Sequence, residues 1–91
     1  MGVMAQLISD KLQDAFQPVQ LRLDDDSARH AGHAGAAPGG ETHFNLIIEA
    51  AAFAGLSRVA RQRAVYAVLK DELAGTLHAL SVKAYAPGEQ A

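Results

Sequence analysis

Apolar residues in the first sixteen positions recur at steps of three and four, the spacing of one face of an α-helix. Polar residues fill most of the positions between them. The apolar face consists of Met4, Leu7, Ile8, Leu12, Ala15 and Phe16. Pro18 follows closely, and proline is a helix breaker because it has no backbone N–H. The pattern therefore predicts an amphipathic helix that ends before Pro18.

After Pro18 the pattern changes to a period of two residues, which is typical of a strand with one buried face. The alternating apolar positions are Val19, Leu21 and Leu23 in the first such segment and Phe44, Leu46 and Ile48 in the second. We expect these two segments to form an antiparallel hairpin. The loop at its tip would run from Asp24 to Thr42, which is unusually long for a small domain.

The second half of the chain contains a connector, a helix and a strand. In the connector, residues 50–56, Phe53 is expected to pack into the core and Gly55 to allow a turn. Ser57 is a favourable N-cap, and Gly75 is placed to end the helix that follows. The predicted buried stripe of this helix is Val65, Val68, Leu69 and Leu73. Residues 77–85 alternate again as a third strand, and 86–91 are expected to be a flexible tail.

The predicted order of elements is α-β-β-α-β, which indicates an α+β fold. A three-stranded sheet would be packed by helices on one face. The length of 91 residues is that of a single domain, 1–91.

Composition and charge narrow the classes of function. The chain has no cysteine, which excludes disulfides and a cysteine-type zinc site. Eight basic and ten acidic side chains give a net charge of −2, which argues against a broad nucleic-acid footprint. Glu49 interrupts the longest apolar run, and the N-terminus resembles neither a signal nor a transit peptide. We therefore expect a cytoplasmic protein without a membrane segment.

Three of the four histidines lie in or next to the long loop, at His30, His33 and His43. Imidazole is the remaining soft ligand for a metal when thiolates are absent. The loop could therefore hold a mononuclear zinc or iron ion, or it could be a solvated loop without a site. His43 is more simply interpreted as a structural residue, or as one that orients a ligand by hydrogen bonding.

Catalytic patterns are weak in this chain. Ser27 and Ser57 lack a nucleophile elbow, and no phosphate-binding glycine pattern surrounds them. The run Asp24-Asp25-Asp26 lacks the alternate spacing of a calcium loop. We expect no enzymatic activity.

The predicted second helix carries a basic surface. Arg58, Arg61 and Arg63 lie in its N-terminal half, and Arg63, Tyr66 and Lys70 share one face by their spacing. Such a surface suits phosphate groups or an acidic protein partner. An ordinary solvated helix face remains an equal alternative.

Several short motifs together resemble the BolA family over nearly the whole chain. They are Asp25-Asp26-Ser27 with the histidine-rich loop, Glu41-Thr42-His43-Phe44, Phe53-Ala54-Gly55-Leu56-Ser57, Arg61-Gln62-Arg63-Ala64-Val65-Tyr66, Glu72-Leu73 and Leu77-His78-Ala79-Leu80-Ser81. Their order and spacing carry the resemblance more than any single motif. One departure is Gln62, where the family usually has histidine.

The resemblance implies a class II KH-like fold and a role in iron–sulfur and redox homeostasis. It implies binding to a monothiol glutaredoxin, with a [2Fe-2S] cluster bridged between the two proteins. The glutaredoxin would supply a cysteine and glutathione, and this chain would supply His78 together with His33, or with His30 in its place. By the residues alone, His78 is more simply interpreted as a structural histidine on an apolar strand face, and the resemblance is what favours a ligand. We expect a monomer alone and a heterodimer with the partner.

The family also includes transcription regulators linked to stress responses, so a KH-like module that binds DNA through the basic helix 57–74 is the alternative function. The pattern Gly32-His33-Ala34-Gly35 resembles the Gly-x-x-Gly loop of KH domains. It lies in the hairpin loop and not between two helices, so we do not assign it that role.

Overall fold

The computed structural model describes residues 2–25, 43–75, 77 and 79–89. Its elements are α1 (Val3–Phe16), β1 (Gln20–Asp25), β2 (His43–Glu49), the 3-10 turn η2 (Ala51–Phe53), α2 (Arg58–Val68), α3 (Lys70–Ala74) and β3 (Ala79–Tyr85). The predicted α-β-β-α-β order is confirmed, with the second helix divided into α2 and α3.

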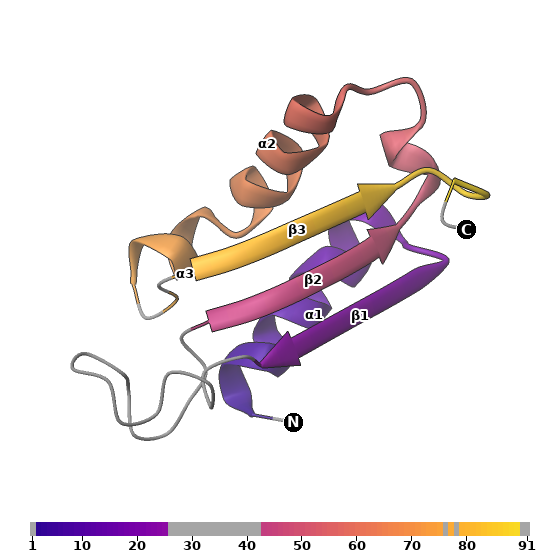
Figure 1. Ribbon diagram of the computed structural model, residues 1–91. Helices are drawn as coiled ribbons and strands as arrows, with labels where there is room; N and C mark the ends of the chain where they lie inside the picture. Colours follow the sequence, from indigo (N-terminus) through magenta and orange to yellow (C-terminus); the bar gives the residue numbers. More distant parts are fainter. Residues whose placement is uncertain (1, 26–42, 76, 78, 90–91) are drawn as a thin grey trace.

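The three strands form one sheet in the order β1-β2-β3. β1 pairs antiparallel with β2, as predicted for the hairpin, and β2 pairs parallel with β3. A parallel pair needs a long crossover connection, and the chain makes it through α2 and α3. Figure 1 shows α1 and α2 beside this sheet. Both helices bury side chains against the same sheet face, so the α+β architecture with helices on one face is confirmed.

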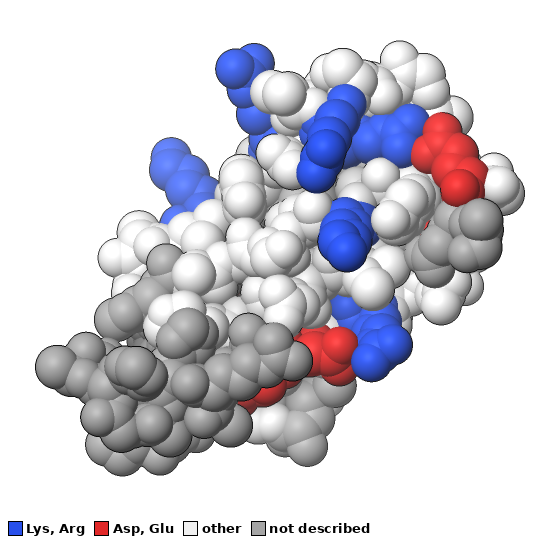
Figure 2. Space-filling view, in the orientation of Figure 1, with Lys and Arg blue, Asp and Glu red and all other residues white. Residues whose placement is uncertain are grey.

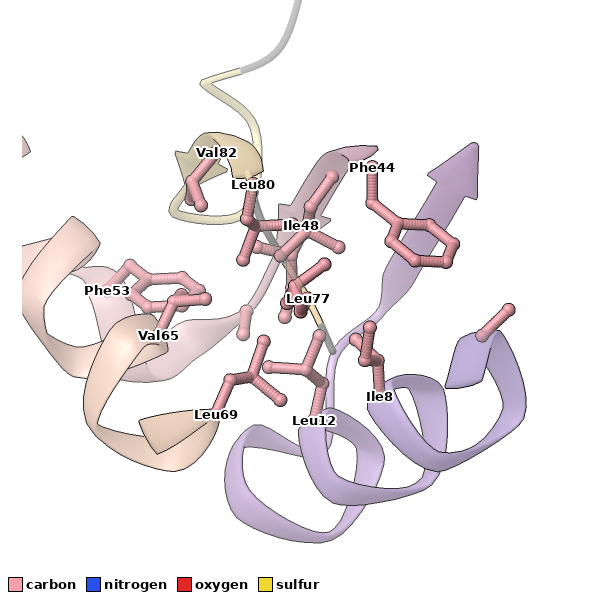
Figure 3. Close-up of a cluster of buried hydrophobic side chains, with 13 residues drawn as sticks. Ile8, Leu12, Phe44, Ile48, Phe53, Val65, Leu69, Leu77, Leu80 and Val82 are labelled. Carbon is pink, nitrogen blue, oxygen red and sulfur yellow. The ribbon is translucent and has the colours of Figure 1, made fainter. Parts of the chain in front are cut away.

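The core lies between the helices and the inward-facing residues of β2 and β3. Its fully buried side chains are Ile8, Leu12, Leu46, Ile48, Phe53, Val65, Leu69 and Leu77. Figure 3 shows most of these residues pointing toward one another from both helices and the sheet. Phe53 anchors the connector as expected, and its ring lies 5.0 Å from that of Phe16 on α1, centroid to centroid. Gly55 has a positive φ of 77° in the turn that follows, which glycine adopts without steric cost.

The buried face of α1 is narrower than the sequence predicts. Ala5, Ile8 and Leu12 are buried, whereas Leu7 is 40% exposed and Ala15 is also exposed. Leu7 is rotated by about 100° around the helix from Ile8, so it points away from the centre of the contact. The predicted apolar face of this helix is therefore too wide at Leu7 and Ala15, which are not buried.

The first strand is displaced toward the C-terminus relative to its prediction. Val19, predicted to face inward, precedes β1 and is 69% exposed, because it lies in the bend after the helix that covers the sheet. At the other end, Asp24 and Asp25 still pair with Asn45 and Phe44 of β2. The predicted start of the long loop at Asp24 is wrong, since β1 continues through Asp25.

The predicted helix 57–74 begins and ends as expected but is interrupted. The Ser57 hydroxyl caps α2 by accepting a hydrogen bond from the Ala60 N–H, at 3.1 Å. Leu69 has φ −102° and ψ 20°, and this departure from helical geometry separates α2 from α3. Leu69 lies at this break, and its side chain is fully buried in the core. α3 ends at Ala74, immediately before Gly75.

The third strand begins later than predicted. Leu77 is 1% exposed but precedes β3, which starts at Ala79. The Leu77 and Gly75 N–H groups both donate to the Glu72 carbonyl, each at 3.1 Å. These hydrogen bonds form the turn that leads from α3 toward β3, which is why Leu77 is not part of the strand.

Candidate functional site

The two segments that carry the candidate histidines join the sheet at the same end. The chain enters β2 at His43 and β3 at Ala79, and these two residues are register partners of the parallel pair. The segment 26–42 precedes His43, and His78 precedes Ala79 in the chain. Parallel strands begin at the same edge of a sheet, so both segments join the described fold at this end.

The three predicted cluster ligands, His30, His33 and His78, lie outside the described residues. His43 lies inside them and is partly buried at the start of β2. Across the described part of the chain, no group of three or more histidine, aspartate or glutamate side chains could hold a metal ion. The alternative site built from His30, His33 and His43 includes two residues beyond that part.

The residues of the predicted basic surface differ in exposure and in the contacts that they make. Arg58 and Arg63 are exposed on α2, but the side chain of Arg61 is only 13% exposed. Its guanidinium donates to the carbonyls of Leu56 and Ala84, at 3.0 and 3.1 Å. Arg61 therefore holds the connector and β3 in place, and it is less accessible to a partner than the other two arginines.

The carboxylate of Glu89 binds Arg61 in a two-pronged ion pair. The oxygens Oε1 and Oε2 lie 2.6 and 3.1 Å from the guanidinium nitrogens Nη1 and Nη2. The Ala86 N–H also donates to Oε1, at 2.8 Å. The hydrogen bond from Arg61, followed by that from Ala86, lowers the pKa of Glu89 to about 2, and the pKa of Arg61 is raised in return. The segment assigned to a tail is thus attached to the domain as far as Glu89.

The predicted face of Arg63, Tyr66 and Lys70 spans the break between the two helices. The Tyr66 hydroxyl donates to the Leu80 carbonyl at 3.1 Å, which ties α2 to β3. Lys70 is exposed and begins α3, beyond the break at Leu69. Of the five predicted surface residues, Arg58, Arg63 and Lys70 present cations to solvent, while Arg61 and Tyr66 hold elements together.

A groove lies between the N-terminal half of α2 and the C-terminal half of β3. It encloses about 570 Å³, and its lining includes Arg58, Arg61, Gln62, Lys83 and Glu89. Figure 2 shows basic atoms spread over this side of the molecule, with acidic atoms touching them at the upper right. The sequence gives no direct signal for this groove, because its walls come from segments about twenty residues apart.

A partly buried ion pair also escaped the sequence prediction. Lys11 of α1 donates to both carboxylate oxygens of Glu72, whose side chain is only 6% exposed. Glu72 lies three residues after the buried Leu69, on the inward side of the helix. That spacing is the signal in the sequence that could have identified it.

In the residues that the structure describes, no helix has both the length and the apolar character needed to cross a membrane. The cytoplasmic location expected from the sequence stays a prediction.

Comparisons with known proteins agree on one family. Residues 12–89 match the family model described as BolA-like protein. The chain is 46% identical over 93 residues to SufE-like protein 1, chloroplastic/mitochondrial, of Arabidopsis thaliana, a match covering 98% of this chain and 25% of that protein. It is 40% identical over 88 residues to BolA-like protein 1 of Bos taurus, covering 97% of this chain and 62% of that protein. The chain thus spans less than two thirds of either relative.

A solved structure extends the agreement from sequence to fold. The BolA domain of SufE1 from Arabidopsis thaliana matches with a TM-score of 0.87 and 46% identity, covering 98% of both chains. The family model spans most of the chain, and the three-dimensional match includes the same arrangement of sheet and helices. This chain belongs to the BolA-like family.

Proposed function

We propose that this protein is a non-enzymatic BolA-like adaptor in iron–sulfur and redox homeostasis. It would bind a monothiol glutaredoxin and complete a shared [2Fe-2S] cluster with His78 and with His33, or His30 in its place. The observation that carries the proposal is the register pairing of His43 with Ala79, because the segments bearing these histidines enter the fold side by side there. Membership of the BolA-like family supports it.

The donor set of the chain fits a shared cluster better than a self-contained one. The chain has four histidines and no cysteine, so it can offer imidazole but no thiolate. A [2Fe-2S] cluster with two imidazole ligands still needs two thiolates, which a glutaredoxin cysteine and glutathione would supply. An imidazole must be neutral to bind iron, so this half of the ligation would weaken as the pH falls through the histidine pKa. The bound cluster would supply one-electron chemistry and a transferable iron–sulfur unit.

The proposal also includes the oligomeric state and the compartment of the protein. The free protein would be a monomer, and the complex with glutaredoxin a heterodimer. The compartment would be the cytoplasm, although the plant relative is named chloroplastic/mitochondrial.

The test is anaerobic reconstitution of the cluster with this protein, a monothiol glutaredoxin and glutathione. Absorption and circular dichroism in the visible range report the ligands of the cluster. We expect His78→Ala to change the spectrum and shorten the lifetime of the heterodimeric cluster. His33→Ala and His30→Ala, compared with each other, would identify the loop ligand. A spectrum unchanged by His78→Ala would refute the assignment of this ligand.

A second candidate function is DNA binding through α2. The observation in its favour is that Arg58, Arg63 and Lys70 all present exposed cations from α2 and α3. The pairing of Arg61 with Glu89 counts against it, because a fourth cation is already neutralised within the chain.

A further inference from the structure

The groove between α2 and β3 is distinct from the histidine end of the sheet. It lies along residues 82–85, the C-terminal half of β3, whereas the histidine segments join at Ala79. A ligand here would therefore be independent of the proposed cluster. The groove contains three cationic side chains, Arg58, Arg61 and Lys83, against one carboxylate, Glu89.

The groove already holds a carboxylate that belongs to its own chain. Both oxygens of Glu89 bind the Arg61 guanidinium, the geometry in which arginine recognises carboxylates most strongly. Glu89 is nevertheless 45% exposed, so the pair lies at the mouth of the groove. The intramolecular pair thus indicates that this groove can bind a carboxylate group.

The outer edge of β3 is protected against pairing with another strand. β3 is an edge strand of the described sheet, and edge strands expose backbone groups that can recruit a foreign strand. Here the Leu80 carbonyl accepts from Tyr66 and the Ala84 carbonyl accepts from Arg61. Because side chains of α2 occupy these acceptors, a ligand in the groove would be recognised by charged side chains more than by strand addition.

We propose that this groove binds an acidic peptide segment of a protein partner, and that Glu89 is the built-in competitor for it. A carboxylate of the partner would replace Glu89 on Arg61. Arg58 and Lys83 would bind neighbouring acidic groups, since both line the groove and are exposed. Gln62 would add a neutral donor and acceptor on the wall between them.

The experiment measures binding of a fluorescein-labelled hexaglutamate peptide to the full chain by fluorescence anisotropy at low ionic strength. Glu89→Gln removes the competing charge, and we expect it to tighten binding. Arg58→Ala and Lys83→Ala should each weaken binding, by roughly two- to fivefold, which is the range for partly exposed ion pairs. A hexaglutamine peptide of the same length is expected not to bind.

Arg63→Ala is the matched control, because Arg63 is an exposed arginine of the same helix that does not line the groove. An equal loss of affinity in Arg63→Ala and Arg58→Ala would overturn the proposal, since it would indicate diffuse attraction to the whole surface. Unchanged affinity in Glu89→Gln would overturn it as well. A single-stranded oligonucleotide that binds more tightly than the peptide, with the same dependence on Arg58 and Lys83, would reassign the groove to nucleic acid. Thermal unfolding by circular dichroism verifies that each variant is folded.

Discussion

Lys11 on α1 and Glu72 on α3 form a partly buried ion pair between the two helices, with Nζ 2.8 and 3.0 Å from the two carboxylate oxygens. The Glu72 side chain is 6% exposed and that of Lys11 is 33% exposed. The backbone carbonyl of Glu72 also accepts hydrogen bonds from Gly75 and Leu77. A single residue thus connects the first helix to the turn that precedes β3.

Removal of the Lys11 charge should lower the free energy of unfolding, because the Glu72 carboxylate is buried. Lys11→Met leaves the Glu72 carboxylate buried without its cation, and we expect a loss of about 2 kcal/mol in the free energy of unfolding. Urea denaturation followed by circular dichroism measures it. The double variant Lys11→Met, Glu72→Met should recover much of the loss, because no charge is left unpaired. Equal stability of wild type and the single variant would contradict this account.

The Arg61–Glu89 pair should make part of the stability depend on acid pH. Its carboxyl has a pKa of about 2 in the folded protein, against 4.5 for an ordinary glutamate. A lowered pKa means that the contribution is complete above about pH 4.5 and is lost as the pH falls toward 2. The difference in Tm between wild type and Glu89→Gln should therefore narrow across this range. A difference that stays constant from pH 6 to about pH 2 would show that the charge of Glu89 contributes nothing.

The N-cap of α2 offers a local test of helix stability. Ser57→Ala removes the acceptor for the Ala60 N–H and should cost about 1 kcal/mol. Ser57→Asp keeps an oxygen acceptor at this position and should retain most of the stability. Chemical denaturation of the two variants side by side provides the measurement, and the cap has no role if both unfold at the same denaturant concentration.

The DNA-binding alternative makes its own prediction. If α2 contacts phosphates, the double variant Arg58→Ala, Arg63→Ala should weaken binding to a DNA duplex of any sequence. The slope of log K against log salt should become less steep by about 2, one unit for each lost phosphate contact. Titrations by anisotropy at several salt concentrations measure both quantities. An affinity that does not respond to salt would exclude this function for the helix.

Periodicity predicted the elements well because each one buries a single face. The alternation of Phe44, Leu46 and Ile48 placed β2 correctly, and its residues are buried and partly buried in turn. The cap at Ser57 was also predictable, since it depends only on neighbouring residues. The error at Leu7 arises because the buried face of α1 is limited to Ala5, Ile8 and Leu12. The error at Val19 arises because this residue lies in the bend before β1 and outside the strand.

The long-range contacts were not predictable from the sequence pattern. Arg61 belongs to the predicted partner surface because it lies in the basic N-terminal half of the helix, but its guanidinium is bound by Glu89, 28 residues later. The break at Leu69 likewise has no glycine or proline to mark it. For the histidine site, the resemblance supplied the residues, and the parallel register of β2 and β3 adds the shared point of entry. Contacts of this kind depend on topology, which single-sequence patterns describe least well.

The length of β3 determines how far the histidine end of the sheet lies from the groove. Its residues, Ala79–Tyr85, rise about 3.3 Å each, so Ala79 at the histidine end lies about 10 Å from Val82, where the groove begins, and about 20 Å from Tyr85, where it ends. One protein bound at each end would be held at this distance by a hydrogen-bonded strand, without a flexible linker. A single partner that reached both ends would form its second contact at a high effective concentration, so two weak contacts within one complex would act together as a stronger one.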